Sequence, residues 1–136
     1  MRAVLDPNVV ISGALSPRGA PADVLRSLAA GDFELVASRV LLDELQRALA
    51  YPKLRRLISE ADAAELVRWV ADSATISVDP DTDPPVHSRD PDDDYLIALA
   101  STHRVALVSG DKDLLSLEGQ IPVFSPRGFL DLLAGA

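Results

Sequence analysis

The chain has 136 residues, of which 13 are Lys or Arg, 21 are Asp or Glu and none is Cys. This length fits one folded domain, so we expect residues 1–136 to form a single domain. The net charge of −8 argues against binding nucleic acid through bulk charge, and the lack of Cys excludes a disulfide scaffold, an iron–sulfur cluster and a Cys-based zinc site.

Apolar strands and helices alternate along the sequence. In the first half of the chain the pattern predicts a strand at 2–6, a helix over 8–15 opened by Pro7, a helix at 21–30, a strand at 33–37, a helix to about residue 50 capped by Ser38, and helices at 53–59 and 61–72. In the second half it predicts a strand at 74–78, a Pro/Asp-rich loop at 79–89, a helix at 90–103, a strand at 105–109, a helix at 111–117, a strand at 122–124 and a helix at 126–133. This alternation indicates a parallel sheet covered by helices on both faces. The apolar runs are far shorter than the roughly 20 residues that span a bilayer, and we expect a cytoplasmic protein without a membrane segment.

Acidic residues fall where a parallel sheet places its ligand site, beyond the carboxyl ends of the strands. Asp6 ends the first predicted strand, and Asp111 follows the fourth by two residues. Glu44 and Asp93 lie early in helices that are expected to start near the same edge. These acids are therefore the candidates for a functional site.

A helical wheel narrows the choice within the two helices. Glu44 lies at the edge of the apolar stripe of its helix, whereas Asp43 faces water. In the helix predicted for residues 90–103, Asp92 and Asp93 both flank the apolar stripe, and Asp94 points away. The wheel leaves the choice between Asp92 and Asp93 open.

Two explanations fit these acids. Each one taken alone is explained as a helix cap, a first-turn acid or an ordinary surface residue. Taken together, carboxylates 4 Å apart repel by ~4 kcal/mol at an effective dielectric of about 20, so a cluster takes up protons or binds a cation. Oxygen ligands without Cys favour Mg²⁺ or Mn²⁺, which suit the hydrolysis of phosphodiesters.

Several segments, in their order and spacing, resemble the PIN-domain family, in its branch of VapC-like toxin components of toxin–antitoxin systems. The segments are VLDPNVVISGALSPRGAPADVL, LVASRVLLDELQRALAYPKLRRLI, RDPDDDYLIALA, LVSGDKDLL and VFSPRGFLDLL. The resemblance covers nearly the whole chain. It implies a three-layer α/β/α sandwich with a central parallel sheet of four to five strands, and a divalent-metal-dependent ribonuclease.

The resemblance also assigns site residues. The family's acids match Asp6, Glu44, Asp93 and Asp111, which are thereby implied to be catalytic and to hold one or two Mg²⁺ or Mn²⁺ ions. The family usually begins with Asp-Thr-Asn, whereas Pro7 stands at the middle position here, so one hydroxyl near the metal is missing.

Three polar residues are candidates for holding those acids in place, namely Asn8, Ser12 and Ser109. Hydrogen bonding in turns and caps explains each of them equally well. A basic stretch could track RNA phosphates or could be a solvated helix face; it comprises Arg47, Lys53, Arg55 and Arg56.

The resemblance to toxins further implies a cognate antitoxin and a homodimer. The apolar residues that could supply a dimer surface could equally be core; they are Leu54, Leu57, Ile58, Leu66 and Val70. Two other functions compete with the ribonuclease. One is a non-catalytic module that binds RNA or a partner, and the other is a phosphatase of the haloacid dehalogenase type. The phosphatase needs a second Asp two residues after the first, where this chain has Asn8.

Overall fold

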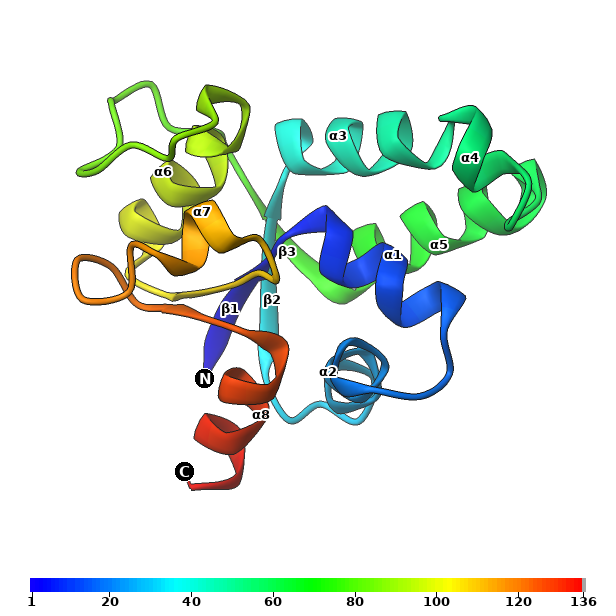
Figure 1. The fold of residues 1–136 in the computed structure, drawn as a ribbon, viewed down its shortest axis with the longest axis horizontal. Helices are drawn as coiled ribbons and strands as arrows, with labels where there is room; N and C mark the ends of the chain where they lie inside the picture. Colours follow the sequence, from blue (N-terminus) through cyan, green and yellow to red (C-terminus); the bar gives the residue numbers. More distant parts are fainter. Residues whose placement is uncertain (136) are drawn as a thin grey trace.

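The computed structural model describes residues 1–135, in which strands and helices alternate as in Figure 1. The strands are β1 (Arg2–Leu5), β2 (Glu34–Ser38), β3 (Ala74–Ser77), β4 (Ala106–Val108) and β5 (Val123–Phe124). The helices are α1 (Pro7–Leu15), α2 (Ala20–Ala29), α3 (Arg39–Leu49), α4 (Pro52–Arg55), α5 (Glu60–Ser73), α6 (Asp94–His103), α7 (Lys112–Leu115) and α8 (Pro126–Ala134), with a 3₁₀ turn η1 (Pro91–Asp93) before α6.

The five strands form one parallel sheet in the order β3-β2-β1-β4-β5. β1 therefore lies in the centre, with β2 and β4 beside it. In register, Ala3 of β1 pairs with Leu35 of β2 and with Ala106 of β4. Because the strands are parallel, all their carboxyl ends meet at one edge of the sheet.

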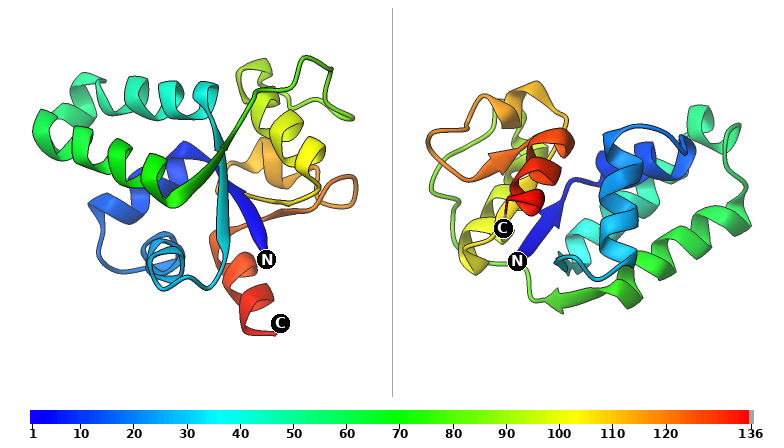
Figure 2. Two further views of the ribbon diagram at one scale, coloured as in Figure 1. Left: turned by 180° about the vertical axis from the view of Figure 1, so that it is seen from behind. Right: turned by 90° about the horizontal axis from the view of Figure 1, so that it is seen from below.

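Helices cover both faces of this sheet (Figures 1 and 2), which confirms the predicted three-layer fold. Successive side chains of a strand point to opposite faces. Ala3 and Leu5 accordingly join a core with side chains of α1, α2, α3, α5 and α8, whereas Val4 joins a second core with side chains of α6 and α7. β1, β2 and β4 are buried on both faces, which explains why their sequences are largely apolar.

Capping residues join the strands to the helices that follow them at the carboxyl edge. Asp6 caps α1, Ser38 caps α3, Asp111 caps α7 and Ser125 caps α8, each by accepting a hydrogen bond from a backbone N–H in the first turn. Pro7 occupies the first helical position of α1, where no N–H is required. The connections at this edge are therefore short and fixed.

Two sequence-based expectations need correction or refinement. The helix predicted from Asp90-Pro91 to residue 103 begins instead with the 3₁₀ turn η1, because the N–H of Asp93 donates to the Asp90 carbonyl three residues earlier, at 3.1 Å. Of the residues suggested for a dimer surface, Val70 is buried, Leu57 is 64% exposed, and Leu54, Ile58 and Leu66 pack against the core.

Within residues 1–135, every helix is too short or too polar to cross a membrane.

Candidate active site

Asp6 is the central acid of the carboxyl edge. It follows β1 directly and is only 4% exposed. Its backbone N–H donates to the Val108 carbonyl at 2.9 Å, which continues the pairing of β1 with β4. Oδ1 accepts the backbone N–H of Asn8 at 2.9 Å, and Oδ2 accepts the hydroxyl of Ser109 at 2.8 Å. The carboxylate is therefore held from two sides, while burial raises its pKa above the usual value.

Ser109 links the ends of β1 and β4. Its side chain is fully buried, donates to Asp6 and accepts the backbone N–H of Asp111 at 3.0 Å. Asp111 in turn accepts the N–H of Asp113 at 3.0 Å as the cap of α7. Asp6 and Asp111 thus serve as helix caps and also lie at the same edge of the sheet, linked through Ser109.

Replacing Ser109 by Ala is expected to lower the free energy of unfolding by about 1–3 kcal/mol, because a buried carboxylate oxygen and a backbone N–H both lose their partner. Urea unfolding measures this change. Ser116 is exposed and also hydrogen-bonded, so Ser116→Ala serves as the matched control, with an expected effect under about 0.5 kcal/mol. Equal effects of the two substitutions would contradict the importance of this link.

Asp93 lies beside Asp6 and Asp111. Burial, a hydrogen-bonding contact with Asp111 and the negative charges of Asp6, Asp111 and Asp90 raise the pKa of Asp93 to about 7. Asp93 is therefore near enough to Asp111 for the two carboxylates to repel each other when both are ionised. The structure therefore brings together three of the four acids suggested by the sequence.

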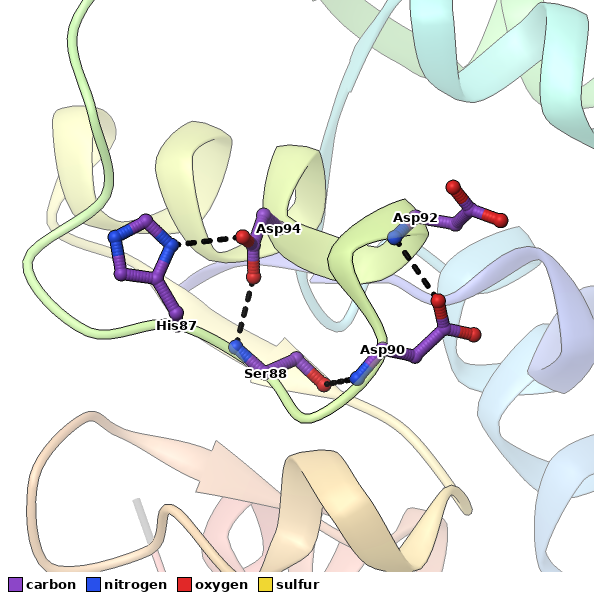
Figure 3. A network of polar contacts seen from close by, with 5 residues as sticks. All are labelled: His87, Ser88, Asp90, Asp92 and Asp94. Carbon is purple, nitrogen blue, oxygen red and sulfur yellow. Dashed lines mark hydrogen bonds and ion pairs between the residues drawn. The ribbon is translucent and has the colours of Figure 1, made fainter.

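The two neighbours of Asp93 have other surroundings, as Figure 3 shows. Asp92 is exposed, and its backbone N–H is bound by Asp90. The Asp94 carboxylate accepts the backbone N–H of Ser88 at 2.7 Å and contacts Nδ1 of His87 at 2.8 Å. Asp94 thereby fastens the loop before η1 to α6, and Asp93 is the residue of this run that faces the other acids.

Glu44, on α3, lies near Tyr95 but its carboxylate is bound to an arginine of its own helix. Its Oε1 accepts a hydrogen bond from Nη1 of Arg47 at 2.8 Å, and its side chain is 34% exposed. The pKa of Tyr95 is raised by burial and then by the charges of Asp6, Glu44, Asp93 and Asp79. Glu44 is thus close enough to the cluster to act on the same tyrosine.

Two residues near the site were missed from the sequence, namely Tyr95 and Asp79. Asp79 reaches from the loop after β3 to the start of α3, where its Oδ2 accepts the N–H of Val40 at 3.0 Å. Its Oδ1 is buried and has no hydrogen-bond partner among residues 1–135. A contact between residues 39 positions apart leaves no local pattern in the sequence. For Tyr95, the only sign in the sequence that it lies near the site is its position two residues after Asp93.

The remaining candidates are dispersed. Asn8 contacts Asp6 through its backbone rather than its side chain, and both Asn8 and Ser12 are exposed. Lys53, Arg55 and Arg56 lie in or directly after α4, at the end of the α3–α5 arm that is remote from α6 and α7 (Figure 1). Arg47 alone of the basic stretch touches a candidate acid.

The donors of the cluster suit a hard divalent cation in kind, because they are all carboxylate oxygen atoms and Asp93 lies near Asp6 and Asp111. As the side chains stand, no three His, Cys, Asp or Glu residues in the described part of the chain are positioned as ligands of one ion. Coordination therefore needs rotation of side chains, for which half-buried Asp93 and Asp111 have more freedom than Asp6.

Comparison with known proteins identifies the family. The family model described as PIN domain matches residues 2–113. The chain belongs to the PIN domain family. The uncharacterized protein MJ1680 of Methanocaldococcus jannaschii is 28% identical over 120 residues, covering 88% of this chain and 77% of that protein.

Solved structures share the fold at low sequence identity. PAE2754 from Pyrobaculum aerophilum matches with a TM-score of 0.65 and 16% identity, covering 100% of this chain and 97% of that one. VapBC2 from Rickettsia felis, bound to a DNA fragment from its promoter, matches with a TM-score of 0.62 and 14% identity over 92% and 98% of the two chains. FitAcB from Neisseria gonorrhoeae matches with a TM-score of 0.57 and 22% identity over the same shares.

Proposed function

We propose that this protein is a divalent-metal-dependent endoribonuclease and the toxin of a toxin–antitoxin pair. The observation that carries the proposal is the convergence of Asp6, Asp93 and Asp111 at the carboxyl edge of a parallel sheet. Membership of the PIN domain family supports a nuclease. The likeness of the fold to VapBC2 and FitAcB supports the toxin role.

Asp6, Asp93 and Asp111, with Glu44 after release from Arg47, would hold one or two Mg²⁺ or Mn²⁺ ions. When bound, such an ion offsets charge on the phosphate and makes water a stronger nucleophile near neutral pH. Ser109 and the Asn8 N–H fix the direction of the Asp6 carboxylate. Asp93 has to lose its proton before it can bind a cation, so we expect cleavage to rise with pH as Asp93 ionises around pH 7.

The cleavage of a circular RNA tests the proposal, since only an internal cut can convert a circle to a linear product. We expect Mg²⁺ or Mn²⁺ to support this conversion and EDTA to stop it. p-Nitrophenyl phosphate is included because its hydrolysis without RNA cleavage would instead indicate a phosphatase. Circles that stay intact at all metal concentrations would contradict endonuclease activity on that RNA. Circles of varied sequence are therefore used.

The basic α4 region offers a place to hold the RNA backbone away from the acids. Lys53, Arg55 and Arg56 are exposed there. The binding constant for single-stranded RNA falls with salt by a logarithmic slope of about 0.7 per phosphate contacted. Removing two contacts with Arg55→Ala and Arg56→Ala is therefore expected to reduce this slope by about 1.4.

Fluorescence anisotropy with a labelled RNA at several salt concentrations measures the slope. Arg68 is an exposed arginine on α5, so Arg68→Ala is the control and is expected to leave the slope unchanged. If the double variant keeps the wild-type slope, the basic stretch is a solvated surface and RNA is held elsewhere.

The partners follow from the same proposal. A toxin has a cognate antitoxin, which we expect to cover the acidic edge, and it acts on RNA in the cytoplasm. We also propose a homodimer, for which Leu57, 64% exposed, is the available apolar contact among the five residues considered.

A further inference from the structure

A cleft opens beside the acid cluster. It has a volume of about 400 Å³ and lies between α1, the start of α2, the turn after β4 and the start of α8. Pockets that bind small organic groups start at roughly 300 Å³, so this cleft has room for one nucleoside. Asp111 forms part of its lining and also belongs to the acid cluster. A base held in the cleft would consequently lie next to a phosphate bound at the acid cluster.

Two polar side chains project from one face of α1 into this lining. Asn8 and Ser12 are separated by four residues, which places them one above the other on the helix. The Asn8 backbone N–H is used by Asp6, whereas its side-chain amide and the Ser12 hydroxyl make no hydrogen bond to another described residue. An amide offers one donor face and one acceptor face, and a hydroxyl offers both, so the pair can match the edge of a nucleobase.

Three other residues that line the cleft are apolar. Val9, Pro21 and Pro126 line it, and flat apolar surfaces suit the faces of a base. α1 and α2 pack closely at Gly13, where an added Cβ would lie 2.8 Å from the Pro21 carbonyl oxygen. The wall carrying Pro21 therefore has a fixed position relative to Asn8 and Ser12.

We propose that this cleft holds the base of the nucleotide flanking the scissile phosphate, and that Asn8 and Ser12 select that base. The proposal rests on the proposed ribonuclease function. It gives the two residues a role in substrate choice rather than in holding the acids.

Base preference is the readout that separates selection from a general loss of structure. Single-stranded RNAs carrying each of the four bases at the positions flanking the cut are compared by kcat/KM. We expect the wild-type protein to prefer one base at one position by about tenfold or more, as one well-placed bidentate contact allows. In the double variant Asn8→Ala, Ser12→Ala this preference is expected to fall to about twofold or less.

A matched control is available on the same helix. Ala14 is exposed and does not line the cleft, so Ala14→Leu should keep the wild-type preference. Gly110 does line the cleft, and a Cβ added there would meet no atom within 4 Å, so Gly110→Leu adds bulk at the cleft wall. We expect that variant to lose at least about tenfold in kcat/KM while its Mn²⁺ binding is unchanged. A wild-type protein without base preference, or a double variant that keeps it, would overturn the proposal.

If the wild-type protein cuts none of these RNAs, the ribonuclease proposal fails for them, and binding then decides the role of the cleft. The four nucleoside 5′-monophosphates are titrated into the labelled full chain and followed by NMR. Shifts at Asn8, Ser12 and Gly110 that differ among the four nucleotides, and that disappear in Gly110→Leu, would support base selection. The absence of shifts at these residues would overturn it.

Discussion

Replacing Asp6 by Asn is expected to reduce metal-dependent RNA cleavage by more than about a hundredfold while the fold is retained. Replacing a residue that only orients a metal ligand commonly lowers activity by about 10–100-fold, and Asp6 is proposed to be a ligand itself. The Asn side chain keeps an oxygen for the Asn8 N–H, and its amide can donate to Ser109. The loss would therefore reflect the missing charge rather than a broken junction between β1 and α1.

Initial rates on an end-labelled RNA, with circular dichroism as a check of the fold, measure this effect. Asp72 is an exposed acid on α5, so Asp72→Asn is the control and should cleave at the wild-type rate. Full activity of a clean Asp6→Asn preparation would remove Asp6 from the site.

Replacing Asp93 by Asn is expected to raise Tm at pH 8 in the presence of EDTA, because the cluster costs stability when its acids are ionised. The pKa of Asp93 is about 7 in the folded protein and near 3.8 in the unfolded chain, so the folded state binds the proton more tightly. The stability associated with this group is fully present below about pH 4 and is lost as the pH rises through 7. The advantage of the Asn variant therefore grows from pH 4 to pH 8.

The expected gain in Tm is roughly 2–4 °C, which corresponds to about one kcal/mol at this chain length. The gain is this small because solvent screens the charge of Asp93, which is only half-buried. Asp92→Asn is the matched control, since the neighbouring Asp92 is exposed, and it should leave Tm at pH 8 unchanged. Adding Mn²⁺ should raise the Tm of the wild-type protein more than that of Asp93→Asn. A variant less stable than the wild-type protein at pH 8 would contradict the crowding of these acids.

The sequence predicted the sheet and the place of its acids because strong local signals coincide there. Asp6 and Asp111 each follow an apolar strand and precede a helix, and parallel strands bring such positions to one edge. Ser109 was suggested as a supporting residue, and the structure places its hydroxyl between the two acids.

Other features could not be predicted because they depend on geometry or on distant contacts. The helical wheel left Asp92 and Asp93 open because it assumes 100° per residue, whereas these residues lie in a 3₁₀ turn with three residues per turn. The hydrogen bond between Asp79 and Val40 joins segments 39 residues apart. The engagement of Glu44 by Arg47 depends on side-chain rotamers that spacing along a helix permits but does not fix.

In the proposed nuclease, Asp6 and Asp93 belong to one divalent cation site. Electron paramagnetic resonance of free Mn²⁺ tests it most directly, because the signal of the hydrated ion falls as the protein binds it. We expect the wild-type protein to remove one or two equivalents of Mn²⁺, and the double variant Asp6→Asn, Asp93→Asn to remove none at the same concentrations. Equal Mn²⁺ binding by the two proteins would contradict the site, whatever RNA cleavage either one shows.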